Sequence, residues 1–184
     1  MIENLLNKIS PKRQTDRELI TRAFEFAKRA HGGQLRDGGE PYISHPLAAA
    51  EMLANLKLDS SAIAACLMHD VLEDTPVTEE QMEKEFGKEI TFLVKGVTKL
   101  SNLNYQGEPN PKDKQNLKAA SLRKMLFAMA EDIRVILIKL ADRYHNVSTL
   151  HSCPPEKRRR IALETLEIYA PIAERLGMGQ IKGD

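Results

Sequence analysis

Apolar residues recur every three or four positions through most of the chain, and this spacing predicts α-helices. We expect helices at about residues 16–31, 47–56, 60–75, 78–86, 88–100, 117–130 and 133–150. A last helix is expected from Pro154 to about residue 177, bent at Pro171, and a short apolar patch in residues 1–14 predicts one more. No stretch has the alternation typical of a strand, so the predicted fold is all-α.

Two segments interrupt the helical pattern. Glycines and prolines in residues 34–46 forbid a continuous helix, so a loop leads to His45 and to Pro46 in the first turn of the next helix. Residues 101–116 are polar, with two prolines and a glycine, and a loop of this length is either mobile or functional. We expect one domain over residues 1–184: an N-terminal extension at 1–14, a mobile loop at 101–116, and the start of a linker at 177–184.

Composition argues against several classes of protein. With 27 basic and 26 acidic residues, the chain has no general nucleic-acid-binding or membrane-binding character. It contains no apolar run of about 18 residues and no signal-peptide pattern. Cys66 and Cys153 lack metal-type or disulfide-type spacing, which favours free thiols in a reducing cytoplasm. The one basic cluster, residues 157–160, is expected to be a solvated helix face.

The predicted helix 60–75 combines a wide apolar face with a polar side that carries His69, Asp70, Glu73 and Asp74. Three carboxylates so close together repel one another, and a partly buried carboxylate without a partner is costly. A divalent cation supplies that partner. A solvated acidic face that contains a histidine explains the stretch equally well.

Two more polar residues stand at unusual positions. His45 lies at a helix start, and Asp142 lies in the middle of the most apolar helix, 133–150. Taken singly, His45 fits a capping or core histidine, and Asp142 fits a buried carboxylate satisfied by a neighbour. Together with His69 and Asp70 they form a mixed nitrogen and oxygen donor set suited to Mn²⁺, Fe²⁺, Zn²⁺ or Mg²⁺. Four such ligands leave room for water and a substrate oxygen, the arrangement for metal-assisted hydrolysis of a phosphate ester or anhydride.

The other histidines are not expected to be ligands. We expect His31 in a loop, His145 on a helix surface and His151 at a helix end. Asn146 and Thr149 fall on the same helical stripe as Asp142.

His45, His69-Asp70 and Asp142 match the H…HD…D pattern of HD-domain phosphohydrolases. The surrounding sequence resembles, more specifically, the hydrolase domain of the RelA/SpoT homologues, which make and degrade ppGpp and pppGpp. The resemblance rests on four stretches: His31-Gly-Gly-Gln34-Leu-Arg36, Gly39-Glu-Pro-Tyr-Ile-Ser-His-Pro46, His69-Asp-Val-Leu-Glu-Asp74, and Val135-Ile-Leu-Ile-Lys-Leu-Ala-Asp-Arg-Tyr-His-Asn146. It implies an HD-domain helical bundle of roughly eight to ten helices around a single metal site, in a cytoplasmic enzyme. Residues 167–177 resemble the helix that leads toward a C-terminal synthetase domain in long members.

The resemblance also implies a role for each matching residue. The metal ligands are His45, His69, Asp70 and Asp142, for one Mn²⁺ with other divalent ions as alternatives. Glu73 and Asp74 assist water attack, and the sequence leaves open which of them handles the proton. Arg36 packs on the guanine base, and Asn146 and Thr149 contact the nucleotide. The implied activity is hydrolysis of the 3′-diphosphate of ppGpp and pppGpp, which gives GDP or GTP plus pyrophosphate.

Asp37 and Ser148 depart from the family pattern, because relatives often carry lysine and arginine there. Both changes remove positive charge near a polyanionic substrate. Tyr144 also replaces a common leucine. Two alternatives therefore stay open: a small hydrolase acting on NADPH or another phosphorylated nucleotide, and a weakly catalytic nucleotide-binding module that regulates a synthetase.

Overall fold

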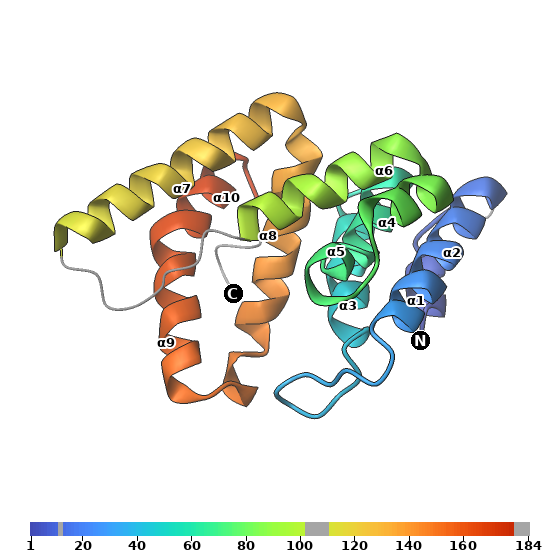
Figure 1. The fold of residues 1–184 in the computed structure, drawn as a ribbon, viewed down its shortest axis with the longest axis horizontal. Helices are drawn as coiled ribbons and strands as arrows, with labels where there is room; N and C mark the ends of the chain where they lie inside the picture. Colours follow the sequence, from blue (N-terminus) through green and yellow to red (C-terminus); the bar gives the residue numbers. More distant parts are fainter. Residues whose placement is uncertain (11–12, 102–110, 179–184) are drawn as a thin grey trace.

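The computed structural model describes residues 1–10, 13–101 and 111–178, and in these ranges the chain is helical (Figure 1). The elements are α1 (Glu3–Asn7), α2 (Gln14–Ala30), α3 (Ser44–Asn55), α4 (Ser60–Leu67), α5 (Val71–Asp74), α6 (Glu79–Ser101), α7 (Pro111–Glu131), α8 (Ile133–Ser148), the 3₁₀ turn η1 (Leu150–Ser152), α9 (Pro155–Glu164), the π-helical turn η2 (Thr165–Tyr169) and α10 (Ala170–Arg175). The described residues form no β-strand, only an isolated bridge between Leu35 and Pro41. The all-α prediction is confirmed.

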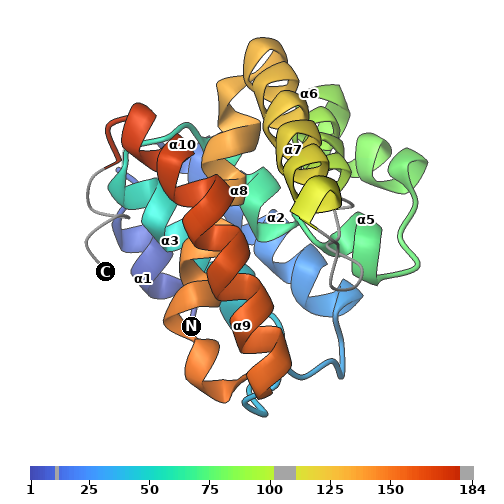
Figure 2. The ribbon, with the colours of Figure 1, turned by 90° about the vertical axis from the view of Figure 1, so that its left-hand side faces the viewer.

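Helix α8 lies at the centre of the molecule. It packs against α3, α4, α6, α7 and α9, and Figures 1 and 2 show it between the N-terminal helices and α9. Five of its apolar side chains are buried, and burying each of the four larger ones contributes about 1.5–3 kcal/mol. These side chains are Val135, Ile136, Ile138, Leu140 and Ala141. The apolar pattern therefore places Asp142, which follows them, inside the molecule.

Helix α6 crosses the top of α8 in Figure 1 and approaches it closely at Gly96. A Cβ atom at Gly96 would lie 2.8 Å from Cγ2 of Val135, so this position requires glycine. Within α6 the backbone of Gly87 is non-helical, with φ 80° and ψ 172°, which only glycine adopts readily. The kink separates residues 79–86 from 88–101 and confirms the two helices that the pattern predicted there.

The prediction of one continuous helix over residues 60–75 is wrong. Helix α4 ends at Leu67, and α5 begins at Val71 after a turn through His69 and Asp70. The ring Nδ1 of His69 donates to the carbonyl oxygen of Cys66 at 2.8 Å. The backbone N–H of His69 reaches the same oxygen at 3.4 Å, so the local bonding is tighter than the regular α-helical ladder. The hydrogen bond from the His69 ring to the backbone therefore coincides with the break between α4 and α5.

The remaining differences concern the C-terminal half. Helix α7 already begins at Pro111, so the predicted loop 101–116 is helical in its last part. The rest of that loop, residues 102–110, and most of the predicted linker, residues 179–184, lie outside the described residues. The disturbance expected at Pro171 lies one turn earlier, in η2, because proline offers no N–H to the preceding turn.

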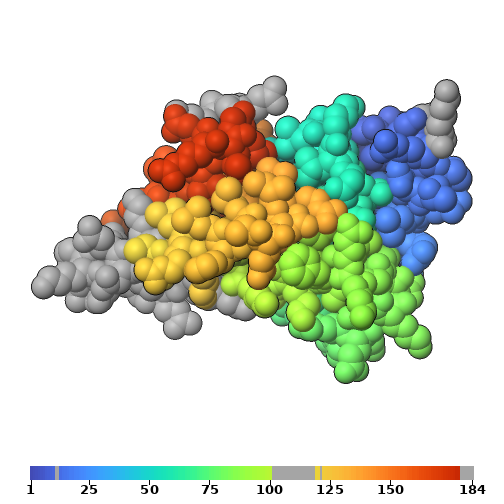
Figure 3. Space-filling view, turned by 90° about the horizontal axis from the view of Figure 1, so that it is seen from above, coloured from blue at the N-terminus to red at the C-terminus, as the bar shows by residue number. Residues whose placement is uncertain are grey.

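Seen from above, the molecule shows α10 in red, the junction of α7 and α8 in orange and α6 in green, with the N-terminal helices in blue and teal beside them (Figure 3). In the described part of the chain, no helix combines the length and hydropathy needed to cross a bilayer.

Candidate active site

Donor atoms from α3, from α8 and from the turn between α4 and α5 converge at the centre of the fold. The ligand atoms of His45, on α3, His69, after α4, and Asp142, on α8, all lie within 4.8 Å of one another. Oδ2 of Asp70 lies 3.1 Å from Nε2 of His69 and 3.9 Å from Nε2 of His45. The structure therefore brings together all four residues that the sequence predicts as metal ligands, although they span almost one hundred positions of the chain.

The two imidazole rings are oriented by contacts behind them. Because Nδ1 of His69 donates to the Cys66 carbonyl oxygen, its Nε2 atom faces the carboxylates. This Nε2 is buried and has no hydrogen-bond partner among the described residues, which is the situation of a ligand atom. Burial lowers the pKa of His69, but the carboxylates of Asp70 and Asp142 outweigh burial and raise that pKa to about 10. A cation among these groups would replace that proton.

His45 is oriented by a second histidine. Its Nδ1 lies 2.8 Å from Nδ1 of His145, and its Nε2 lies 3.1 Å from Oδ1 of Asp142. Burial and the neighbouring imidazole of His45 lower the pKa of His145 to about 4, so His145 is neutral, and one of the two Nδ1 atoms donates to the other. The prediction that His145 lies on a helix surface is wrong, since it is half-buried behind His45. His31 ends α2 and is buried, and His151 is exposed in η1.

Asp142 is buried, and two residues of its own helix, α8, donate hydrogen bonds to its carboxylate. Lys139 donates to Oδ2 at 2.7 Å, and the side-chain amide of Asn146 donates to Oδ1 at 2.6 Å. Burial alone raises the pKa of Asp142, but Lys139 and the two imidazoles outweigh it and hold that pKa well below its usual range. Asp142 is therefore an ionised acceptor that can bind a cation.

The four groups suit a divalent metal ion. Once a cation displaces the proton of His69, two neutral imidazole nitrogens and two carboxylates form a borderline donor set, and each group has a partner that fixes its orientation. His45 and His69 are 2% and 0% exposed at their side chains, so an ion here would be reached only from the side of Asp70 and Asp142.

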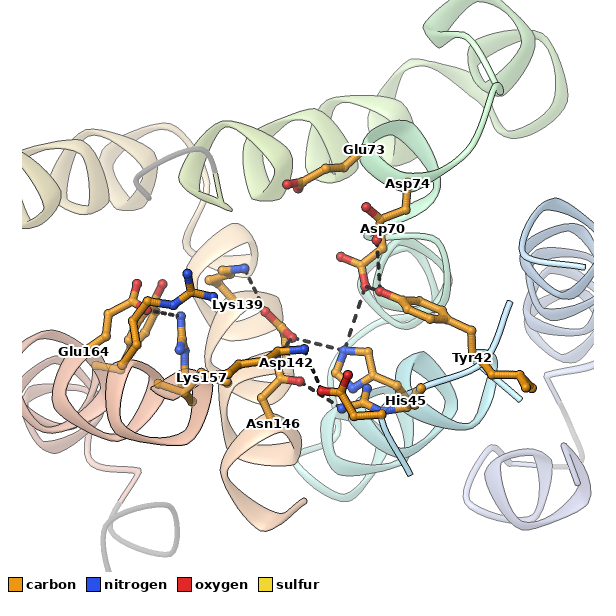
Figure 4. Close-up of a pocket in the computed structure, with 17 residues that line it drawn as sticks. Tyr42, His45, Asp70, Glu73, Asp74, Lys139, Asp142, Asn146, Lys157 and Glu164 are labelled. Atoms are coloured by element: carbon orange, nitrogen blue, oxygen red, sulfur yellow. Dashed lines mark hydrogen bonds and ion pairs between the residues drawn. The ribbon is translucent and has the colours of Figure 1, made fainter. Parts of the chain in front are cut away.

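A pocket of about 330 Å³ opens on that side (Figure 4). Its lining contains His45, Asp70, Asp142 and both predicted catalytic acids, Glu73 and Asp74. The opposite part of the lining comes from the loop before α3 and from α9. It carries three cations, Arg36, Lys157 and Arg160, against the two carboxylates of Asp37 and Glu164, so its net charge is positive. The pocket thus joins an acidic end suited to a cation and a basic end suited to phosphate groups.

Glu73 and Asp74 occupy different places in the pocket. In Figure 4 Glu73 extends from α5 over the pocket, apart from the histidines, whereas Asp74 lies directly above Asp70. Oδ2 of Asp74 is 3.0 Å from the hydroxyl oxygen of Tyr42, and Oδ2 of Asp70 is 2.7 Å from the same oxygen. Burial and these carboxylates raise the pKa of Tyr42 far above its usual range, so its hydroxyl keeps its proton.

The three predicted nucleotide contacts meet one another. The guanidinium of Arg36 donates to Oδ1 of Asn146 and to Oγ1 of Thr149, each at 3.2 Å. Arg36 and Asn146 line the pocket, whereas Thr149 lies behind them and holds Arg36 in place.

Sequence reasoning missed three groups at the site. Lys157 and Arg160 belong to the basic cluster that we expected to be only a solvated face, yet both line the pocket. Lys157 is paired with Asp37 at 2.6 Å, so the acidic residue at position 37 engages one of the cations. Tyr42 stands in the Gly39–Pro46 stretch, and no spacing rule connects it to Asp70 or Asp74.

The comparison with known proteins places this geometry in a family. A family model described as "HD domain" matches residues 23–179. The chain belongs to the HD domain family. The histidine and aspartate cluster of this HD domain could hold a divalent ion, in agreement with the predicted pattern.

The resemblance to the RelA/SpoT homologues is also confirmed. The chain is 51% identical over 181 residues to the bifunctional (p)ppGpp synthase/hydrolase SpoT of Escherichia coli, covering 98% of this chain and 25% of that protein. It is 53% identical over 159 residues to the guanosine-3′,5′-bis(diphosphate) 3′-pyrophosphohydrolase of Haemophilus influenzae, covering 86% of this chain and 23% of that protein. The chain thus spans about a quarter of the length of these relatives.

A solved structure described as a metazoan ortholog of SpoT that hydrolyzes ppGpp is similar in fold. The TM-score is 0.62, and the match covers 82% of this chain and 83% of that chain. At 24% sequence identity this likeness shows the fold alone.

Proposed function

We propose that this HD domain is a metal-dependent (p)ppGpp 3′-pyrophosphohydrolase. The observation that carries the proposal is the convergence of His45, His69, Asp70 and Asp142 at one end of a pocket whose other end is basic. A substrate with a nucleoside and two diphosphate groups matches that division of charge. The names of the relatives, at about half sequence identity, point to the same reaction.

The four residues would hold one ion, for which we propose Mn²⁺ because the donor set mixes imidazoles and carboxylates. Such an ion, when bound, polarises a phosphate oxygen and lowers the pKa of a water molecule. In the reaction a water oxygen bonds to the phosphorus next to the ribose, and the bond from that phosphorus to the 3′-oxygen breaks. GDP or GTP and pyrophosphate leave.

We assign the proton of the attacking water to Asp74. Its carboxylate shares the Tyr42 hydroxyl with Asp70, which places it beside the ligand cluster, whereas Glu73 extends away from that cluster. A carboxylate in this position can accept the proton as the new bond forms.

Arg36 would stack its planar guanidinium on the guanine base, held in place by Asn146 and Thr149. Lys157 and Arg160, at the basic end, would meet the 5′-phosphate groups. The free thiols of Cys66 and Cys153 agree with a cytoplasmic place of action.

The Escherichia coli relative is named for a synthase as well as a hydrolase activity. We propose that the matched quarter of that relative corresponds to its hydrolase part, and that a synthetase domain is its partner on the C-terminal side.

A catalytically weak nucleotide-binding module remains the second candidate, because one observation favours it. The carboxylate of Asp37 lies 2.6 Å from the ammonium group of Lys157 and pairs with a cation that would otherwise be available to phosphate. Such a module would bind ppGpp without releasing pyrophosphate.

The test compares substrates on the purified protein with Mn²⁺. We expect conversion of ppGpp to GDP and pyrophosphate, seen by anion-exchange chromatography, and no comparable phosphate release from NADPH. Asp70→Asn should abolish this conversion, while the control Asp59→Asn should retain it because asparagine still caps α4. Faster turnover of NADPH would favour the alternative substrate. Calorimetric binding of ppGpp without pyrophosphate release would favour the module.

A further inference from the structure

The ring of Tyr42 is fixed before its hydroxyl meets the site. Tyr42 ends the loop that leads to α3, and its backbone N–H donates to the carbonyl oxygen of Gln34 at 3.0 Å. The ring stacks on His31, with centroids 4.5 Å apart and 21° between the planes. His31 is buried and bonded through Nδ1 to the side-chain oxygen of Gln34 at 2.8 Å. Two chain segments therefore hold the phenol in one orientation.

The same loop is attached to α5. The side-chain amide of Gln34 donates to the backbone oxygen of Asp74 at 3.0 Å. Tyr42 and Asp74 are thus connected twice, once through the backbone of α5 and once through the hydroxyl. Figure 4 shows the phenol pointing from the loop toward the gap between Asp70 and Asp74.

The hydroxyl lies between two carboxylates with different tasks. Its distances are 2.7 Å to Oδ2 of Asp70 and 3.0 Å to Oδ2 of Asp74. Oδ2 of Asp70 is also the oxygen that lies 3.1 Å from Nε2 of His69, so it faces the cation site. A phenol has a single proton, so it donates to one carboxylate at a time and keeps both oxygens within reach.

Ring packing alone does not account for this contact. Phenylalanine would stack on His31 as well as tyrosine does, but two carboxylates that approach each other without a donor repel. A hydrogen bond to an ionised carboxylate is stronger than one between neutral groups, and a bond to a metal-binding carboxylate also fixes its direction. The hydroxyl therefore has a use beyond filling space.

We propose that Tyr42 is a positioning residue, whose hydroxyl holds the metal-binding carboxylate of Asp70 and the water-handling carboxylate of Asp74 in a fixed relation. The role toward Asp74 rests on the proposed hydrolytic function, whereas the role toward Asp70 concerns metal binding alone.

The variant that tests this is Tyr42→Phe, which keeps the ring on His31 and removes only the hydroxyl. We expect the affinity for Mn²⁺, measured by calorimetry, to fall by about 10- to 100-fold, and kcat for ppGpp at saturating Mn²⁺ to fall by a similar factor. The KM for ppGpp should stay close to that of the unmodified protein. In the Asp74→Asn background the same change should lower kcat little further, because the two residues act together.

Tyr144→Phe is the matched control, since it removes a hydroxyl from α8 outside the ligand cluster. If Tyr42→Phe matches this control in both Mn²⁺ affinity and kcat, the proposal is wrong. A loss of Mn²⁺ affinity alone would retain the link to Asp70 and overturn the link to Asp74. Should the unmodified protein fail to turn over ppGpp, the proposed function falls, and the Mn²⁺ titrations still decide the role of Tyr42 toward Asp70.

Discussion

The side-chain amide of Asn146 donates to Asp142 at 2.6 Å and, through its oxygen, accepts from Arg36 at 3.2 Å. A single side chain thus contacts both a predicted metal ligand and the predicted base-stacking arginine. The two ends of the pocket are connected through one turn of α8, because Asp142 and Asn146 are four residues apart in the sequence.

Replacing Asn146 should therefore damage both ends of the site together. Asn146→Ala leaves Oδ1 of Asp142 without its amide donor and removes one acceptor from Arg36, which keeps Thr149 and Glu40. We expect Mn²⁺ affinity to fall by about 10- to 100-fold, accompanied by a higher KM for ppGpp. Calorimetry and steady-state kinetics measure the two effects. Ser148→Ala, at an exposed position two residues along the same helix, serves as the control and should change neither.

The acidic pair should separate in its effects. Asp74→Asn keeps the size of the side chain and removes its ability to accept a proton, so kcat should fall by about 10²- to 10⁴-fold with Mn²⁺ binding mostly retained. Glu73→Gln should cost less, because Glu73 extends away from the ligand cluster. Turnover by Asp74→Asn within a few-fold of the unmodified enzyme, or a larger loss in Glu73→Gln, would reverse our assignment.

The contact between Gly96 and Val135 predicts a packing effect away from the site. A methyl group at Gly96 would press on the Val135 side chain at 2.8 Å, so Gly96→Ala should lower the free energy of unfolding by about 1–3 kcal/mol. Val135→Ala opens the space that the new methyl group needs. The double variant should thus be less destabilised than the sum of the single variants, as urea unfolding would show. Additive losses would mean that the two helices do not meet there.

Asp132 should give α8 a pH-dependent share of its stability. Its carboxylate caps the helix by accepting from the backbone N–H of Arg134, and the hydrogen bond from the Arg134 side chain lowers its pKa below the usual 3.8. The charge therefore stabilises the fold above pH 4, and this contribution is lost as the pH falls through the lowered pKa. Asp132→Ala should cost about 1 kcal/mol at pH 7.

Asp132→Asn separates the cap from the charge. It keeps a capping acceptor, so its deficit in free energy of unfolding at pH 7 should be smaller than that of the alanine variant. That deficit should vanish when the pH is lowered far enough to protonate Asp132 in the unmodified protein. Equal deficits for asparagine at pH 7 and at low pH would show that the ion pair with Arg134 contributes nothing.

Local periodicity was sufficient to predict most of the helices and to single out residues 133–150, which contain α8, as the most apolar of them. A run of apolar residues at helical spacing must be buried, and the aspartate within it is then buried too. The pattern failed where a side chain competes with the backbone. The ring of His69 bonds to the carbonyl of Cys66, and no count of apolar positions reveals that the helix breaks there.

The residues that converge on the site were predicted from a family pattern, and their partners were not. His145 looked like a surface residue because α8 was considered alone, whereas α3 brings His45 to 2.8 Å from it. The contact of Tyr42 with Asp70 and Asp74 depends on how the loop before α3 folds back onto α5. Lys157 and Arg160 belong to the site only because α9 faces the same pocket.

The central claim is that His45, His69, Asp70 and Asp142 bind one cation jointly. Its most direct test is an anomalous difference map at the manganese edge, from crystals grown with Mn²⁺. We expect a single peak within bonding distance of the Nε2 atoms of His45 and His69 and of the carboxylates of Asp70 and Asp142. A map with no peak among these four residues, in crystals of a protein that turns over ppGpp with Mn²⁺, would contradict the account.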